Sequence, residues 1–209
     1  MCDLQNAAAS LASIYSYGIS GSDAWGEAVS HTTGATVHQY DCYDLSRPIC
    51  KARTCHFVFH EECLRGSQPM LRPSNTLSAH LLANDHAALP EASLLMKVDI
   101  EGSEWSVFSA TKLEDLKKFQ QIVIEFHAPY ANVIVDAERL NLRLETMRKL
   151  LQVFVIVHVH PNNVCDIWVP QSLTGSQGNC LEVTFANRAL IQPAMCRKPQ
   201  RHPLDAPVD

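Results

Sequence analysis

The chain has 209 residues, of which 46% are hydrophobic and 19% are charged, and its formal net charge is −5. This length predicts one domain with a sizeable core, and the acidic balance excludes a global basic field that would draw the chain to nucleic acid or anionic lipid. No apolar run approaches the ~20 residues of a membrane span, and the first residues show neither the basic stretch nor the apolar core of a signal peptide.

Apolar, β-rich runs alternate with helical patterns, which predicts parallel strands joined by helical crossovers. We expect the first strand over residues 12–17, followed by a helix that begins near Asp23, a good N-cap residue, with Trp25, Ala28 and Val29 on its inner face. Further strands are predicted at residues 35–40, 54–59, 94–99, 121–126, 153–159 and 181–185. Further helices are predicted at about 75–85, between residues 99 and 108, and at 112–119 and 136–151.

The last two predicted strands follow each other without a helix between them, unlike the first six. This order predicts an α/β fold: a doubly wound, seven-stranded, mostly parallel sheet with helices on both faces and an antiparallel last strand beside the sixth. Plain dinucleotide-binding domains usually lack such a return. We expect one domain over residues 1–188 and a proline-rich, disordered tail over residues 189–209.

The cysteines do not determine whether the protein resides in a reducing or an oxidising compartment. There are eight of them, and the four between residues 42 and 63 form no CxxC pair, so a zinc site is only weakly indicated. Cys55 lies in an apolar run, where a buried free thiol is expected. We therefore expect reduced cysteines, with one or two disulfides of the secretory type as the alternative.

Two segments at the ends of the first two strands have the residue types of a ligand site. Tyr17 and Gly18 end the first strand, and Gly18 and Gly21 form a turn in which the backbone could approach a ligand. A carboxylate suits the helix N-terminus that follows. Asp41 ends the second strand, where it could accept hydrogen bonds from ribose hydroxyls, and Asp44 could share or replace that role. The alternatives are a simple tight turn and a solvated loop aspartate.

The fourth strand carries the sharpest signal, in the segment Leu94–Glu104. Lys97 and Asp99 alternate with apolar residues, and Asp99, Glu101 and Glu104 bring three acidic groups to the end of the strand. Capping of the next helix accounts for one carboxylate but not easily for all three. We expect Asp99 and Glu101 to be site residues, Glu104 to shape the helix start, and Lys97 to be structural.

The fifth and sixth strands also end in polar residues. Glu125 and His127 close the fifth strand, and His158 and His160 lie near the end of the sixth. A lone histidine at such a place is usually a packed, hydrogen-bonded residue. Two strands that each end in histidine at one rim favour a shared site, and the two-residue spacing places His158 and His160 on one face of the sheet.

Several of these segments together resemble the FkbM-type methyltransferases, and in particular their animal "methyltransferase-like" branch. The resemblance covers residues 2 to 188 and rests on the segments 14–19, 95–105, 158–163 and 181–185, together with the pair Cys2-Asp3. The most specific motif is Lys-x-Asp-x-Glu-Gly-x-Glu, which begins at Lys97. The resemblance implies the Rossmann-like class I methyltransferase fold, in which the last strand of the sheet is antiparallel.

The resemblance also implies an activity and a cofactor. It implies transfer of a methyl group from S-adenosyl-L-methionine to a hydroxyl of a small or sugar-like acceptor, so the expected partner is a small molecule or glycan and not nucleic acid. The expected cofactor residues are those at the ends of the first, second and fourth strands, namely Tyr17, Gly18, Gly21, Asp41 and Asp99. The expected catalytic residues are His127 or His160 as general base, with Asp99 and Glu101 near the cofactor and acceptor.

The sequence departs from the family in its first turn, which has fewer glycines than a full GxGxG. The chain also begins where the family domain begins, so we expect any upstream anchor or substrate-covering helix to be missing or never to have existed. Two alternatives stay open. One is a metal-dependent enzyme of another class, because a mixed set of N and O ligands for a divalent ion is available from Asp99, Glu101, His127 and His160. The other is a catalytically silent binding module, which would explain why the first turn has few glycines. A nicotinamide-dependent oxidoreductase is less favoured.

Overall fold

The computed structural model describes residues 11–52, 54–127, 137–162, 165 and 180–191, and the backbone of residues 167–168 and 177–178. Nearly all of the tail predicted over residues 189–209 therefore lies outside the described residues. No helix among those described combines the length and the apolar character that crossing a bilayer requires.

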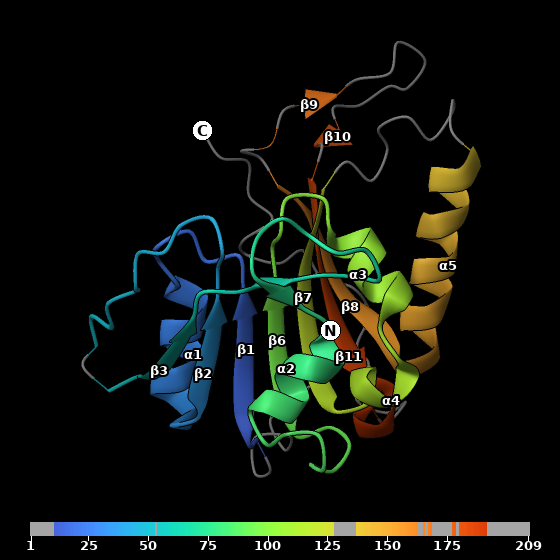
Figure 1. The fold of residues 1–209 in the computed structure, drawn as a ribbon. Helices are drawn as coiled ribbons and strands as arrows, with labels where there is room; N and C mark the ends of the chain where they lie inside the picture. The colour runs from blue at the N-terminus through green and yellow to red at the C-terminus, as the bar shows by residue number, and fades with distance from the viewer. Residues whose placement is uncertain are drawn as a thin grey trace.

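Seven strands form a single sheet in the order β3-β2-β1-β6-β7-β11-β8 (Figure 1). Five neighbouring strands run parallel to one another: β3 (His56–His60), β2 (Thr36–Tyr40), β1 (Ser13–Tyr17), β6 (Leu94–Val98) and β7 (Phe119–His127). The last strand, β11 (Cys180–Asn187), lies between β7 and β8 (Phe154–Pro161) and is antiparallel to both. The predicted architecture, a seven-stranded, mostly parallel α/β sheet with helices on both faces and an antiparallel last strand beside the sixth, is confirmed.

Helices cover both faces of this sheet. On one face, α1 (Ala24–Thr33) packs against a small apolar cluster on β1, β2 and β6. On the other face, one large core joins the sheet to α2 (Leu77–Ala83), α3 (Glu104–Ala110), α4 (Leu113–Leu116) and α5 (Ala137–Val153). Two short ribbons, β4 (Cys63–Leu64) with β5 (Ser74–Asn75) and β9 (Ile167–Trp168) with β10 (Gln177–Gly178), and a 3-10 turn, η2 (Arg188–Leu190), complete the described elements.

The first crossover helix begins and ends as its sequence predicts. The Asp23 side chain accepts a hydrogen bond from the backbone N–H three residues later at 2.7 Å, and Gly34 ends the helix in the left-handed conformation. Trp25 and Val29 pack against the sheet as expected. Ala28 is exposed, so its predicted inward position is wrong, because the helix presents Gly26 and Ser30 as its buried positions instead.

The expectation of reduced cysteines is wrong for the six described ones. They form three disulfides: Cys42–Cys63, Cys50–Cys55 and Cys165–Cys180. Their Cα atoms lie 5.1 to 5.8 Å apart, within the usual range for such bonds. Cys55 is therefore not the free thiol that its apolar surroundings indicated. Two of the pairs join separate elements of the fold, which spacing along the chain does not reveal.

Candidate functional site

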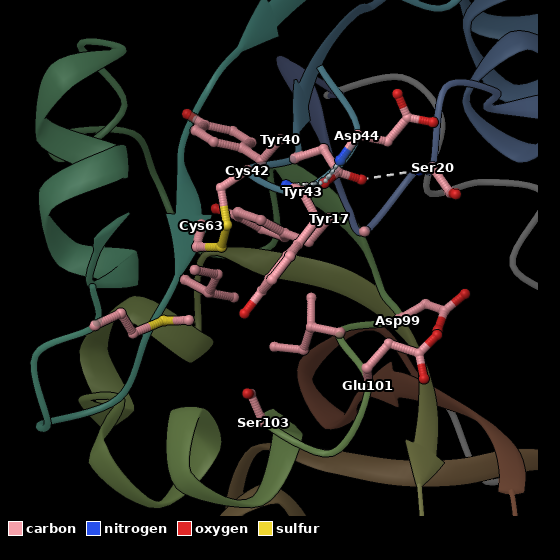
Figure 2. A pocket seen from close by; sticks show the side chains of 15 residues that line it. Tyr17, Ser20, Tyr40, Cys42, Tyr43, Asp44, Cys63, Asp99, Glu101 and Ser103 are labelled. Carbon is pink, nitrogen blue, oxygen red and sulfur yellow. Dashed lines mark hydrogen bonds between the residues drawn. A yellow bond between two sulfur atoms is a disulfide. The ribbon is translucent and has the colours of Figure 1, made fainter. Parts of the chain in front are cut away.

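A cavity of about 440 Å³ opens at the carboxyl ends of β1, β2 and β6 (Figure 2). Its walls come from the turn after β1, residues 40–44 around the end of β2, residues 63, 64 and 70, and the turn after β6. Ligands in open parallel sheets bind at this end, where the strand order reverses, and the volume lies within the range of about 300–1,000 Å³ for small-molecule sites.

The turn after β1 requires glycine because of its protein neighbours. Gly18 and Gly21 have φ values of +71° and +72°, which side chains disfavour. A Cβ atom at Gly18 would lie 1.6 Å from the carbonyl oxygen of Asp99, and one at Gly21 would lie 2.9 Å from Asp44 Oδ2. Of the two predicted glycines, Gly18 borders the cavity and Gly21 lies in the same turn beside Asp44. Their lack of a side chain lets three loops pack together there.

The Asp41 side chain joins the turn after β1 to the loop after β2 at the edge of the cavity. Its Oδ2 accepts a hydrogen bond from Ser20 N at 2.9 Å, and its Oδ1 accepts bonds from the backbone N–H groups of Tyr43 at 2.8 Å and Asp44 at 3.1 Å. A carboxylate has about four acceptor positions, so these three bonds leave room for a ligand hydroxyl at Asp41. Asp44 also lines the cavity, and its carboxylate stands beside the same turn.

Aromatic rings close the inner side of the cavity. Tyr17 and Tyr40 both line it, and their rings stack with centroids 4.7 Å apart. Tyr17 is fully buried, and its hydroxyl lies 3.1 Å from His80 Nδ1. Burial raises the pKa of both phenols above the ordinary value. The predicted site residue Tyr17 therefore reaches the cavity as a neutral ring whose hydroxyl is already engaged.

One wall of the cavity is a disulfide that sequence reasoning did not predict. Cys42 and Cys63 both line the cavity and are bonded to each other. Arg72 donates to the Cys42 carbonyl oxygen at 2.7 Å, and its guanidinium lies 4.4 Å from the centroid of the Tyr43 ring. These contacts hold the loop after β2 against the chain segment beyond β3.

Lys97 joins two of the turns around the cavity. Its Nζ lies 3.2 Å from Asp99 Oδ2 and 3.5 Å from the Gly18 carbonyl oxygen. The lysine thus fixes the Asp99 carboxylate beside the turn after β1, which agrees with the structural role expected for it.

Four carboxylates surround the imidazole of His127 at the outer side of the cavity. Its Nδ1 lies 3.0 Å from Glu104 Oε1, and its Nε2 lies 3.3 Å from Glu101 Oε2, 3.9 Å from Asp99 Oδ1 and 4.0 Å from Glu125 Oε1. The structure therefore brings together three of the four predicted catalytic residues. Asp99 and Glu101 line the cavity, whereas His127 stands behind them and is absent from the cavity lining among the described residues.

Glu104 does more than the helix start requires. Its side chain is fully buried, and its Oε1 accepts hydrogen bonds from the backbone N–H groups of Ile100 at 2.9 Å and Gly102 at 3.2 Å. These bonds shape the turn, as predicted. The same oxygen also binds His127, a long-range contact that the order of residues along the chain did not indicate.

This contact sets the protonation state of His127. The hydrogen bond to Glu104 raises the pKa of His127 to about 9, with help from the surrounding carboxylates and against the effect of burial. Burial and the charge of Asp99 also raise the pKa of Glu125. A raised pKa favours the imidazolium form of His127 at neutral pH, and this form donates hydrogen bonds to the surrounding carboxylates. The general-base role expected of His127 stays a prediction.

His160 is not brought into this group. It lies on β8, opposite Glu182 of β11, and β11 separates β8 from β7. Two strand spacings amount to roughly 10 Å. Its ring stacks with that of His158, with centroids 6.3 Å apart, so the two histidines do share a face of the sheet as predicted.

No protein-family model matches the chain, and no curated protein shows significant similarity to it. Among solved structures, a putative hemolysin from Streptococcus thermophilus is 12% identical with a TM-score of 0.45, over 83% of this chain and 58% of that chain. A TehB-like SAM-dependent methyltransferase from Corynebacterium glutamicum is 13% identical with a TM-score of 0.36, over 88% and 85% of the two chains. A 16S rRNA (adenine(1408)-N(1))-methyltransferase from Catenulisporales acidiphilia is 11% identical with a TM-score of 0.38, over 91% and 90%. Likenesses of this size carry no assignment of activity.

Proposed function

We propose that this chain is an S-adenosyl-L-methionine-dependent methyltransferase that methylates a hydroxyl group of a small or sugar-like acceptor. The observation that carries the proposal is the cavity at the switch point of the sheet, where the turn at Gly18, the loop at Asp41 and the strand end at Asp99 meet. The resemblance in the segment that begins at Lys97 points in the same direction.

The residues around the cavity suit the proposed cofactor. Asp41 retains an acceptor position for a ribose hydroxyl, and the neighbouring Asp44 offers further carboxylate oxygens. Tyr17 and Tyr40 supply flat apolar surface on the inner side. We assign Asp99 to the part of the cavity nearest the acceptor. When bound, the cofactor supplies a methyl group on a positively charged sulfur.

The chain's own residues then have to position the acceptor and accept its proton. Positioning alone can contribute ~7 kcal/mol to lowering a barrier. Asp99 and Glu101 line the cavity and carry acceptor oxygens, so we assign the base role to one of them, in place of His127 or His160. His127, as an imidazolium 3.3 Å from Glu101, is assigned to holding that carboxylate in place.

The first experiment is a thermal-shift and calorimetric titration with S-adenosylhomocysteine. The proposal expects saturable binding and a rise in the melting temperature, because a ligand that binds only the folded state stabilises it. Nicotinamide adenine dinucleotide serves as the control and should cause no shift. Absence of a shift with S-adenosylhomocysteine would overturn the proposal. Binding without methyl transfer to any hydroxylated acceptor would favour the silent binding module.

A second candidate is a divalent-metal enzyme that uses the same rim. One ligand atom each from Asp99, Glu101 and His127 lie within 4.8 Å of one another, and such an N/O set suits a divalent cation. The metal would have to displace the proton of His127. Stabilisation by Mg²⁺ or Mn²⁺ alone, abolished in Asp99→Asn and retained in the exposed control Glu114→Gln, would favour this candidate.

A further inference from the structure

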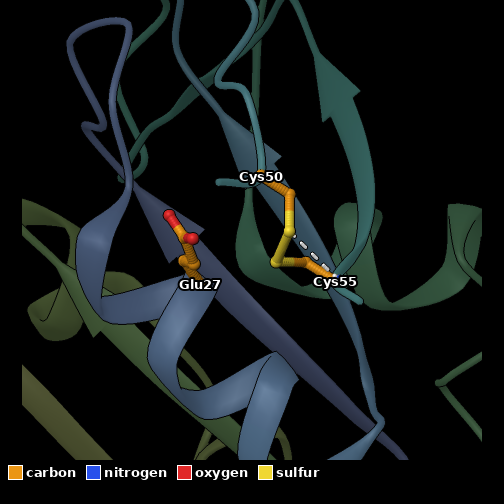
Figure 3. Close-up of side chains that lie close together, drawn as sticks. All are labelled: Glu27, Cys50 and Cys55. Atoms are coloured by element: carbon orange, nitrogen blue, oxygen red, sulfur yellow. Dashed lines mark hydrogen bonds between the residues drawn. A yellow bond between two sulfur atoms is a disulfide. The ribbon is translucent and has the colours of Figure 1, made fainter. Parts of the chain in front are cut away.

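A second cluster of metal-ligand side chains lies away from the cavity, where the loop between β2 and β3 meets α1 (Figure 3). The sulfur atoms of Cys50 and Cys55 and a carboxylate oxygen of Glu27 lie within 4.8 Å of one another. The two cysteines are joined as a disulfide. All three side chains are half-buried, so their ligand atoms are partly withdrawn from water.

Two contacts one helical turn apart dock this loop along α1. Glu27 Oε1 accepts a hydrogen bond from Ala52 N at 2.8 Å, and His31 Nδ1 lies 2.7 Å from Thr54 Oγ1. Because residues four apart share a face of a helix, Glu27 and His31 both face the loop. The cysteines therefore lie in a loop that two contacts of its other residues also join to the helix.

We propose that this cluster is a zinc site when its disulfide is reduced, with Cys50, Cys55 and Glu27 as three ligands. Two thiolates with nitrogen or oxygen ligands are the set that zinc prefers, in tetrahedral geometry. His31 lies one helical turn beyond Glu27, but its ring is not in this group and its Nδ1 lies 2.7 Å from Thr54 Oγ1, so we assign the fourth position to water. Figure 3 shows the Glu27 side chain on α1 beside the Cys50–Cys55 disulfide.

The change from the disulfide to the zinc-bound dithiolate conserves electrons and protons. A dithiol reductant breaks the bond between the two sulfur atoms and becomes a disulfide itself, so that two electrons and two protons pass to the cysteines and leave two thiols. Zinc then binds both sulfur atoms as thiolates and releases two protons. The loop is thus tied by a covalent bond under oxidising conditions and by a metal under reducing conditions.

The site would support the cavity without forming part of it. The loop that ends at Cys55 begins at Asp41, which borders the cavity, and α1 begins directly after the turn that contains Gly18 and Gly21. A link between the far end of this loop and α1 would therefore limit the movement of two cavity walls in both redox states. This inference does not depend on the identity of the ligand in the cavity.

The test uses the full chain, reduced with a phosphine and titrated with Co²⁺ as a spectroscopic substitute for zinc. We expect one equivalent of Co²⁺ to give a thiolate-to-cobalt charge-transfer band and the visible bands of tetrahedral cobalt, and zinc to displace it. The oxidised chain should give no such band. Glu27→Gln should weaken zinc binding roughly tenfold or more, and Cys50→Ser with Cys55→Ser should abolish the band.

The controls separate this site from other thiols. A variant in which the four cysteines of the other two disulfides are serine should keep the band, which excludes the group formed by Cys180 with Glu125 and His127. Circular dichroism confirms that each variant is folded, and protection of Cys50 and Cys55 from alkylation by zinc gives a second measurement. The proposal is overturned if the band is absent from the reduced chain, or if it survives loss of both Cys50 and Cys55.

Discussion

The buried carboxylate of Glu104 lies 3.0 Å from Nδ1 of His127 and also accepts two backbone N–H groups of the turn after β6. One oxygen atom therefore connects the shape of that turn to the charge of the imidazole behind it. This link makes the protonation of His127 a property of the fold, which can be measured without knowledge of any substrate.

Replacement of Glu104 by glutamine should lower the pKa of His127 from about 9 toward the ordinary histidine value. The amide removes the negative charge and weakens the hydrogen bond that favours the imidazolium. An NMR titration of the His127 ring measures the change, and the exposed Glu114→Gln is the control. A His127 pKa that stays near 9 in Glu104→Gln would show that the other carboxylates determine it.

The folded protein should lose stability as the pH falls below about 6.5, because several histidines are buried in their neutral form. Burial lowers the pKa of His80 to about 3 and that of His38 to about 4. A histidine whose pKa is lowered in the folded state contributes stability above its unfolded pKa, and this is lost as the pH falls toward the folded value. For His80 the loss at pH 4 is on the order of 3 kcal/mol.

Chemical unfolding between pH 4 and pH 7 measures this slope. His80→Asn should reduce the dependence of the free energy of unfolding on pH, whereas His56→Asn, on an exposed position of the edge strand β3, should leave it unchanged. Equal slopes in His80→Asn and the unsubstituted protein would contradict the assignment.

Substitution of Gly18 by alanine should destabilise the protein by about 3 kcal/mol or more. The added Cβ would lie 1.6 Å from the Asp99 carbonyl oxygen in a left-handed conformation. Gly34→Ala is a matched control, because its φ of +73° is similar and no atom lies within 4 Å of the added Cβ; it should cost about 1 kcal/mol. Denaturant unfolding compares the two, and similar losses would mean that the turn moves to accommodate the methyl group.

Loss of the Cys42–Cys63 disulfide should weaken binding in the cavity as well as stability. The bond closes a sequence separation of 21 residues, for which about 3 kcal/mol of stabilisation is typical. In the double serine variant we expect a lower melting temperature and weaker S-adenosylhomocysteine binding by calorimetry. As a control, serine at both Cys165 and Cys180 should lower the melting temperature without weakening binding. Equal binding in the two variants would show that the Cys42–Cys63 disulfide does not affect binding in the cavity.

Local features of the fold could be predicted from the sequence. The alternation of strands and helices, the cap at Asp23 and the polar strand ends at Asp41 and Asp99 all depend on neighbouring residues, and all are found in the structure. Contacts between distant elements could not be predicted. Glu104 reaches His127 across 23 positions, and its partner depends on how α3 sits on the end of β7.

The strand order explains why His160 does not join the group around His127, contrary to the prediction from the sequence. The sequence indicated that the last strand would pair with the sixth, which it does, but it did not indicate that the same strand would separate the sixth from the fifth. His127 and His160 therefore end two neighbouring strands in sequence but not in space. Pairing order is a property of the whole sheet, and no local pattern in either strand encodes it.

The position of β11 also bears on how the sheet is completed during synthesis. This strand follows the other strands of the sheet along the chain, yet it supplies the pairing partner for both β7 and β8. Until residues 180–187 leave the ribosome, β7 has one unpaired edge and β8 has no place in the sheet. Unpaired strand edges invite association between chains. Two of the seven strands, β8 and β11, can thus join the sheet only late, by contacts that are distant in sequence and slow to form.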